Sequence, residues 1–373
     1  MTVFTKLGIA LVCILVPVWL IFDHCFSNIA PAQNNLSNSA YISNKEAEQQ
    51  LAYGLSLWRD KKYQQASQEF SIVGTQYLSA DMQSLTRLYQ YHAEAFNKNQ
   101  HFDFMQQVST LPDTCKQKIL FVTPNIESLA QAKHYKKRFS QDSRLSSLPI
   151  CIYDVTWFDP VDIICEESWQ QSGRLGCQLL SLAEKLKTLP SLTFTHLVIF
   201  ADKGKANVHN GIMFLDRMDT YDVFIHELAH FSGFIDEYPL SQGLAKRVCA
   251  GVDAPNIVFK QAEQLHVDKT YWQSIGLQNS TDIFAARTCD NHPNQAFKAS
   301  NQLTFMEYHD TAYIPAHYLT AWQRQLQKTS NLPSAHVNFA QLYEQSRNLL
   351  ESQFWRAKYQ QYISSPVNRV TNL

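Results

Sequence analysis

The sequence predicts an α/β protein of the α+β kind, in which a domain with a mixed sheet follows an all-α helical-hairpin module. Two observations support this prediction. Residues 45–109 have a helical pattern throughout, with no proline and with Gly54 and Gly74 as the only glycines. After Cys115, short apolar runs alternate with helical segments, which indicates a sheet with crossover helices. The length of 373 residues allows two or more domains.

The composition argues against one class of partner. The chain has 32 basic and 33 acidic side chains, and 45% of its residues are hydrophobic. Because the net charge is close to zero, the chain offers no electrostatic footprint for nucleic acid, and we expect no nucleic-acid binding. The apolar content is typical of a packed globular protein.

The N-terminus predicts an export signal or a membrane anchor. Lys6 precedes an uncharged apolar run, Leu7–Phe22, whose length lies between that of a signal core and that of a membrane span. We therefore expect residues 1–26 to be a signal peptide or a transmembrane helix, and residues 27–44 to be a polar linker. An uncleaved segment would attach the protein to a membrane. Either way, the remainder is expected on the periplasmic or extracellular side.

Six cysteines follow this segment, an even number that suggests disulfides in an exported domain. Their spacing does not select one set of pairs. We favour a bond between Cys249 and Cys289, and the alternative is that both are free buried thiols. No CxxC spacing occurs, which argues against a structural cysteine-zinc site.

The helical module is expected to span residues 45–112. It weakly resembles the helix-pair repeat called tetratricopeptide, whose glycine, aromatic, alanine and phenylalanine positions are matched by Gly54, Tyr63, Ala66 and Phe70. A second pair would run through Leu88, Tyr91, Ala95 and Phe104. An ordinary helical hairpin packed on the next domain is the alternative. A protein partner could bind through these helices.

The second domain is expected at residues 113–330. Its predicted strands are 118–123, 150–157 and 196–201, its predicted helices are 126–140 and 179–189, and an edge strand with Gly211 inside it is predicted at Lys205–Leu215. Asp219 is expected to cap the next helix, which starts near Thr220. Residues 331–373 are predicted to form a C-terminal amphipathic helix.

The sequence HELAH occupies residues 226–230 of that capped helix. Residues four apart lie on one helical face, so His226 and His230 can share one metal ion, while Glu227 projects beside it. Zn²⁺ suits two imidazoles, and it lowers the pKa of a bound water to about 7. Glu227 would then accept the proton of that water, as metal-assisted hydrolysis requires.

The residues after HELAH resemble the HExxHxxGxxH/D pattern of the metzincin peptidases. Gly233 lies where the helix would end and the chain turn back, and Asp236 lies at the position of the third metal ligand. The triplet Asp236-Glu237-Tyr238 is also similar to the IgA-peptidase branch of zinc peptidases, in which the acids can be offset by one residue. Glu237 is therefore the alternative third ligand.

Metzincins also have a methionine turn beneath the metal, with a tyrosine two residues later. The sequence TFMEY at residues 304–308 matches this pattern. By resemblance, Met306 would form the apolar floor of the site and Tyr308 would stabilise the developing oxyanion. The resemblance covers about residues 115–328, and it implies a zincin-like catalytic domain, a peptide or protein substrate, and an edge strand along which the substrate backbone lies. Pro315–Leu326 would be its C-terminal helix.

Three alternatives remain open at this point. Glu307 or His309 could supply the third ligand instead of the acidic pair. Two histidines and a carboxylate can also hold iron(II) for oxygen chemistry, although Glu227 would then have no role. Finally, the chain could be a catalytically inactive scaffold of the same fold that acts through its helical module. The leading hypothesis is an exported or membrane-anchored zinc metallopeptidase.

Overall fold

The computed structural model describes residues 39–97, 110–157, 163–188, 193–251, 254–261, 264–266, 273, 283–328 and 332–364. Among these residues, no helix is long and apolar enough to cross a membrane. The expectation of a transmembrane helix is corrected to this extent: the described residues contain no such helix. The apolar run at residues 7–22, the segment 1–26 and most of the linker lie outside the described residues.

The N-terminal module consists of α2 (Ser39–Arg59), α3 (Tyr63–Ile72), the 3₁₀ turn η1 (Thr75–Tyr77) and α4 (Ala80–Asn97). Gly54 of α2 faces the ring of Phe70 in α3, and a Cβ atom at residue 54 would lie 2.7 Å from that ring. The glycine therefore makes room for the phenylalanine, which is buried together with Ala66. Phe104, expected in a second helix pair, lies outside the described residues.

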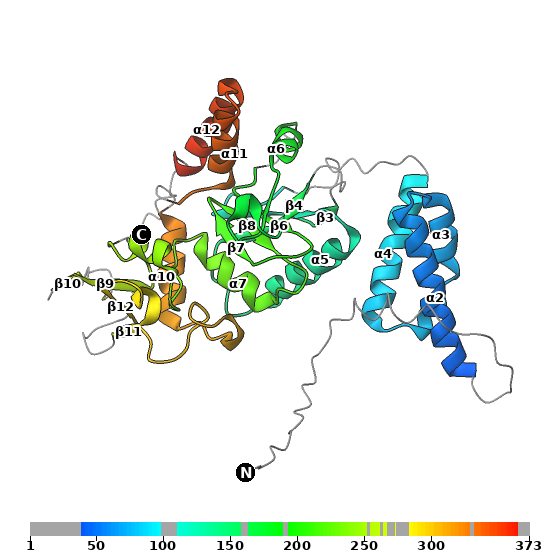
Figure 1. Cartoon of the computed structure of the whole chain (residues 1–373), viewed down its shortest axis with the longest axis horizontal. Coiled ribbons are helices and arrows are strands. Elements are labelled where there is room, and N and C mark those ends of the chain that lie inside the picture. Colours follow the sequence, from blue (N-terminus) through cyan, green and yellow to red (C-terminus); the bar gives the residue numbers. More distant parts are fainter. Residues whose placement is uncertain are drawn as a thin grey trace, which may run out of the picture.

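The module packs on the α/β domain through α5 (Ile126–Gln141), as Figure 1 shows. Ile126 and Leu129 of α5 belong to the same buried apolar cluster as Phe70. The hydroxyl of Tyr89 in α4 donates a hydrogen bond of 2.5 Å to Glu127 of α5. The helical module thus shares a core with the first crossover helix.

The central sheet is mixed, as predicted. Its strands are β1 (Gln117–Thr123), β2 (Ile150–Ile152), β3 (Thr156–Trp157), β6 (His196–Phe200), β7 (Asn207–His209) and β8 (Ile212–Leu215). The order is β2-β1-β6-β8-β7, with β3 also paired to β1. All pairs are parallel except β7 with β8, so β7 is an antiparallel edge strand.

The expectation of one strand from Lys205 to Leu215 is wrong, because this segment is a β-hairpin. Asn210 and Gly211 form its turn with φ angles of 43° and 77°. Two successive residues with positive φ characterise the tight turn that suits the twist of a hairpin. A Cβ atom at Gly211 would also lie 2.4 Å from the backbone of Ser334 and Ala335, so only glycine fits there.

Helices cover both faces of the sheet. Alternate residues of β1 face opposite sides: Ile119 and Phe121 pack in one buried cluster, and Leu120 and Val122 pack in the other. The first cluster includes residues of α5, of α7 (Tyr221–His230) and of α10 (Ala316–Gln327); the second includes residues of α6 (Leu180–Lys187), α11 (Ala335–Gln345) and α12 (Leu349–Ser364). A sheet buried on both faces explains why its strands are apolar throughout.

The predicted single C-terminal helix is instead the pair α11 and α12, which pack on each other. Arg347 between them has a φ of 60°, and the amide of Asn348 donates 2.8 Å to the carbonyl of Tyr343. A left-handed residue with such a hydrogen bond ends a helix and redirects the chain. Helical periodicity continued across this break, so the sequence pattern did not reveal it.

The remaining elements lie beside the sheet. They are the hairpin β4 (Cys165–Glu166) and β5 (Gly176–Cys177), the helix α8 (Gln242–Val248), and a second sheet of β9 (Ile257–Gln261), β10 (Gln264–His266), β11 (Phe284–Ala286) and β12 (Gln295–Lys298). The second sheet follows the HELAH helix in sequence and precedes Met306.

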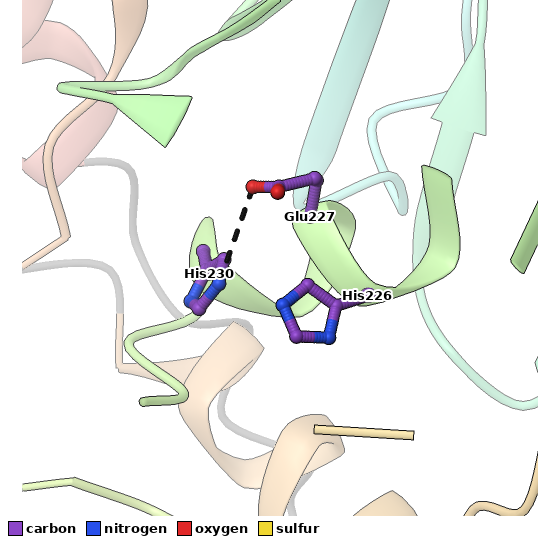
Figure 2. Close-up of side chains that lie close together, drawn as sticks. All are labelled: His226, Glu227 and His230. Carbon is purple, nitrogen blue, oxygen red and sulfur yellow. Dashed lines mark ion pairs between the residues drawn. The ribbon is translucent and has the colours of Figure 1, made fainter. Parts of the chain in front are cut away.

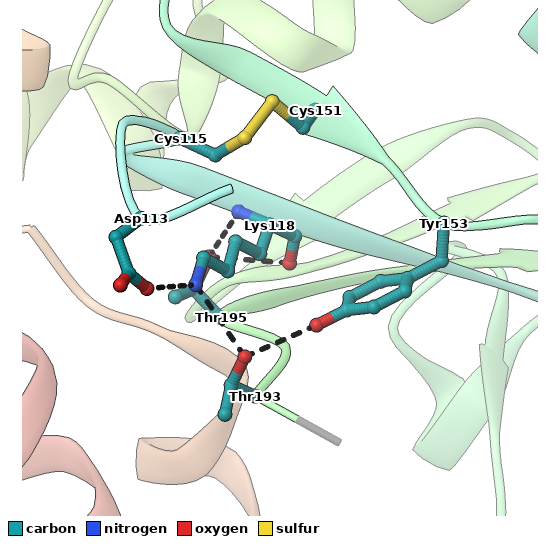
Figure 3. Close-up of a disulfide and its surroundings, with 7 residues drawn as sticks. All are labelled: Asp113, Cys115, Lys118, Cys151, Tyr153, Thr193 and Thr195. Carbon is teal, nitrogen blue, oxygen red and sulfur yellow. Dashed lines mark hydrogen bonds and ion pairs between the residues drawn. A yellow bond between two sulfur atoms is a disulfide. The ribbon is translucent and has the colours of Figure 1, made fainter. Parts of the chain in front are cut away.

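The six cysteines of the described residues form three disulfides: Cys115–Cys151, Cys165–Cys177 and Cys249–Cys289. The expected Cys249–Cys289 pair is confirmed, and the alternative of two free thiols is wrong. Figure 3 shows how the first bond ties the start of β1 to β2. Nearby, the ammonium group of Lys118 lies 3.4 Å from Asp113 and 3.5 Å from the hydroxyl of Thr193.

Acid should destabilise the fold through two buried histidines. Burial lowers the pKa of His196 and of His336 to about 3. The unfolded chain binds these protons near pH 6.5 and the folded chain does not, so the stabilisation is complete above about pH 6.5 and declines as the pH falls. We expect the free energy of unfolding to fall by on the order of 1 kcal/mol per pH unit for each histidine.

Denaturant titrations at pH 7, 6 and 5 would measure this slope in the wild type and in His336→Gln, with the exposed His134→Gln as the control. The slope should become shallower only in His336→Gln. A wild-type stability that stays constant across this range would contradict the prediction.

Candidate metal centre

Helix α7 carries the HELAH sequence and is buried from Val223 to Ala229. Its N-cap is Thr220, whose side-chain oxygen accepts a hydrogen bond from the amide of Val223 at 3.4 Å. The expected cap, Asp219, instead accepts a hydrogen bond of 2.7 Å from the amide of Asp216 and so closes the preceding turn. A helix that is apolar on most sides is held in place by the core.

Figure 2 shows that His226, Glu227 and His230 converge on one side of α7. Each residue offers one ligand atom, a ring nitrogen or a carboxylate oxygen, and these three atoms lie within 4.8 Å of one another. The three side chains could therefore hold one metal ion. The Glu227 oxygen lies 4.0 Å from Nε2 of His230. The structure therefore brings together the residues that the helical spacing predicted to meet.

Both histidines are oriented by backbone carbonyl groups. Nδ1 of His226 lies 2.8 Å from the carbonyl oxygen of Phe305, and Nδ1 of His230 lies 2.8 Å from that of Phe234. A carbonyl oxygen accepts only, so each Nδ1 carries the proton that it donates. Each Nε2 is then the ring atom left to act as a ligand, which is how metal-binding imidazoles are commonly fixed.

Asp236 lies opposite the two imidazoles. Its Oδ1 atom is 3.0 Å from Nε2 of His226 and 3.1 Å from Nε2 of His230. The helix ends at His230, and Gly233 turns the chain with a φ of 81°, which a glycine adopts without strain. The turn expected at Gly233 thus delivers Asp236 to the place expected of a third ligand.

The charges of this group are strongly coupled. Burial opposes the charged form of His230, but the Asp236 carboxylate outweighs it and raises the pKa of His230 to about 9. Burial also opposes ionisation of Asp236, yet the two imidazoles hold the pKa of this carboxyl well below its usual range. Burial raises the pKa of Glu227. The arrangement thus favours an ionised Asp236, and it makes the carboxyl group of Glu227 easier to protonate.

Glu237, the alternative third ligand, points into the core. It is completely buried, and its carboxylate accepts hydrogen bonds from Thr304 at 2.6 Å, Tyr318 at 2.6 Å and Asn256 at 3.0 Å. Lys298 lies 3.5 Å away. Since both oxygens of Glu237 are engaged away from the imidazoles, the geometry favours Asp236 as the ligand.

The methionine loop lies beneath the histidines. Met306 is fully buried, its carbonyl accepts a hydrogen bond of 2.9 Å from the amide of Glu237, and the preceding Phe305 supplies the carbonyl that holds His226. The role of Met306 as the apolar floor of the site stays a prediction. The two other alternative ligands are engaged elsewhere, Glu307 with Lys298 and His309 with Asp310.

Tyr308 is 52% exposed, and its side chain stacks on His309. Its role as an oxyanion stabiliser stays a prediction. A different tyrosine lies in the site: the ring of Tyr238 is parallel to that of His226 at 6.2 Å, and burial together with the Asp236 carboxylate raises the pKa of its hydroxyl. Sequence reasoning quoted Tyr238 beside the acidic pair without giving it a role, and its adjacency to Asp236 was the available signal.

A cavity of about 300 Å³ opens beside these residues. Glu227, His230, Asp236 and Tyr238 line one part of it, and the strand β7 with its flanking residues lines another. Arg174 and Lys205 also line it and were not expected from the sequence, because no local pattern marks them. Within the segment expected to form one edge strand, β7 and its flanking residues therefore border this cavity.

Comparisons with protein-family models, with curated proteins and with solved structures found no match to this chain.

Replacing each of the two adjacent acids by its amide should separate their roles. Asp236→Asn is expected to weaken zinc binding by more than about 100-fold, because it removes the carboxylate between the imidazoles. Glu237→Gln should retain zinc but lower the free energy of unfolding by about 1–3 kcal/mol, since the amide group of glutamine would replace one of two oxygens that both accept hydrogen bonds.

Zinc affinity would be measured by competition with a chromogenic chelator, and stability by denaturant titration of the metal-free chains. Loss of zinc binding in Glu237→Gln together with its retention in Asp236→Asn would instead identify Glu237 as the ligand.

Proposed function

We propose that this protein is a zinc-dependent metalloendopeptidase with a zincin-like catalytic domain. One observation carries the proposal: two carbonyl groups orient His226 and His230 so that both Nε2 atoms face the same oxygen of Asp236. This donor set fits zinc, which takes three protein ligands in catalytic sites, often two histidines and a carboxylate. The resemblance to metzincins and to the IgA-peptidase branch of zinc peptidases supports the same conclusion.

When bound, zinc supplies a Lewis acid and lowers the pKa of a bound water. His226, His230 and Asp236 would hold the ion. The chain's own contribution to proton transfer comes from Glu227, which lies beside these three ligands and is not itself one of them. Because burial raises the pKa of Glu227, its carboxylate is suited to accept a proton from the attacking water and to return it to the leaving amine.

The substrate would lie along β7. This strand pairs with β8 on one side, and its other side is the edge of the sheet within the described residues. An extended peptide can add to such an edge through backbone hydrogen bonds, which bind without regard to side chains. Because β7 borders the same cavity as Glu227 and His230, a peptide on this edge would present its backbone to the catalytic residues.

Two other chemistries fit less well. Iron(II) can be held by two histidines and a carboxylate, but Glu227 is buried beside the ligands, and that chemistry gives it no function. An inactive scaffold would not need both histidines oriented toward one carboxylate oxygen. The three disulfides favour an oxidising compartment, and we propose that the protein acts after export.

Glu227→Gln should abolish hydrolysis while leaving the metal in place. We expect about one zinc per wild-type chain by mass spectrometry, and a decrease in kcat/KM of about 10²–10⁴-fold in the variant, because the general base is lost. The exposed Glu167→Gln is the matched control. A chelator should remove the wild-type activity, and added zinc should restore it.

Cleavage of unfolded casein and of random peptide pools would provide the readout. A wild-type chain that binds no zinc, or one that binds zinc and hydrolyses none of these peptides, would contradict the peptidase proposal and favour a scaffold.

A further inference from the structure

The cavity beside the candidate metal centre contains two cationic side chains. Arg174 and Lys205 line it, and its only other charged lining residues, apart from the His230 imidazole, are Glu227 and Asp236. Both acids belong to the group of residues already described. Apart from that group, the charged lining residues of the cavity among the described residues are therefore the two cations.

The backbones of these two cations are fixed side by side. Asn207 of β7 is buried, and its amide group donates hydrogen bonds to the carbonyl of Leu175 at 2.9 Å and to that of Lys205 at 3.1 Å. Leu175 follows Arg174 in the loop that leads to β5, and the disulfide Cys165–Cys177 closes this hairpin. One buried amide thus connects the segment that carries Arg174 to the segment that carries Lys205.

A second contact holds the same two segments together. Gly204 has a φ of 144°, and a Cβ atom there would lie 2.9 Å from the side chain of Leu175. Next to it, Lys203 forms an ion pair of 3.0 Å with Glu167 of the hairpin. The residues on either side of the cationic pair are therefore packed or paired.

Unlike the side chain of Lys203, the side chains of Arg174 and Lys205 have no salt-bridge or hydrogen-bond partner among the described residues. Both residues are exposed. Two cations are thus held at the cavity without an anion of their own.

We propose that Arg174 and Lys205 form a subsite for a carboxylate of the peptide substrate. This inference rests on the proposed peptidase function and assigns a substrate class to the same site. A guanidinium pairs with a planar carboxylate through two parallel hydrogen bonds, and the lysine adds a second positive charge. The carboxylate can come from an aspartate or glutamate side chain near the scissile bond, or from the C-terminus of the substrate.

A singly charged group suits the cavity because Glu227 and Asp236 also line it, so a more highly charged anion would meet greater repulsion. A peptide extended along β7 would pass close to both cations, since Lys205 lies two residues before this strand and Asn207 ties Arg174's segment to it. The preference for acidic peptides would therefore be set by the same edge that binds the backbone.

The test compares pools of octapeptides that are blocked at both ends and differ only in having glutamate or glutamine at one fixed position. A third pool has glutamine and a free C-terminus. Cleavage would be followed by mass spectrometry with the full chain, with Arg174→Gln/Lys205→Gln, and with Lys137→Gln, which changes an exposed lysine of α5, as the control. The measured quantity is the ratio of cleavage rates between pools.

We expect the wild type and Lys137→Gln to prefer a carboxylate pool by about tenfold or more, which is the effect of one charge-assisted hydrogen bond. The ratio should approach one in the double variant, and Arg174→Glu/Lys205→Glu should prefer a fourth pool that has lysine at the fixed position. Preference for the glutamate pool identifies a side-chain carboxylate, and preference for the free C-terminus identifies a terminal one. Equal rates on all pools, or a ratio that the double variant leaves unchanged, would overturn the proposal.

Binding distinguishes this inference from the proposed function. Equilibrium binding of fluorescent versions of the pools to Glu227→Gln needs no hydrolysis. A carboxylate preference that depends on Arg174 and Lys205, in a protein that cleaves no pool, would reject the peptidase and retain the subsite. Cleavage without any carboxylate preference would retain the peptidase and reject the subsite.

Discussion

Two backbone carbonyl groups determine what the centre of this protein can do. The carbonyls of Phe305 and Phe234 accept hydrogen bonds from the Nδ1 atoms of His226 and His230, and they leave both Nε2 atoms facing Asp236. An imidazole that could rotate freely would present either nitrogen. Because the two carbonyls come from loops far apart in sequence, the site requires the whole second domain to fold around α7.

Glu237 links these loops. Its amide binds the carbonyl of Met306, and its carboxylate binds Thr304 before the methionine and Tyr318 in α10. A buried carboxylate with several donors is costly to disturb, because removing one partner leaves charge without compensation. The neighbouring Asp236 is thereby held at the imidazoles. The two adjacent acids thus have different roles: Asp236 lines the cavity, and Glu237 forms hydrogen bonds that hold the methionine loop in place.

Much of this centre could be predicted from local sequence. Helical spacing is enough to place His226 and His230 on one face, and glycine at residue 233 is enough to indicate a reversal after the helix. The choice between Asp236 and Glu237 was not determined locally, because it depends on which acid finds donors in α10 and in the methionine loop. Arg174 and Lys205 escaped prediction for a similar reason, since only the tertiary contacts of Asn207 bring them to the cavity.

The fold, too, was predictable where local sequence patterns determine it and not where backbone conformation does. Apolar runs identified the parallel strands, and the mixed sheet was foreseen, but the break at Arg347 and the turn at Asn210 depend on backbone conformations that periodicity does not report. The Cys249–Cys289 bond was favoured from position alone and is present. In the other direction, the expected membrane-spanning helix has no counterpart among the described residues.

The turn at Gly211 links the cavity to a late part of the chain. The side chain of Asn338 in α11 donates hydrogen bonds to the carbonyls of His209 and Asn210, at 2.6 Å and 3.0 Å, and the backbone of Ser334 and Ala335 fills the space at Gly211. Chains emerge from the ribosome N-terminus first, so β7 lacks this support until α11 has been made. A nascent chain would thus carry HELAH, Asp236 and Met306 before the β7–β8 hairpin is held in place by α11.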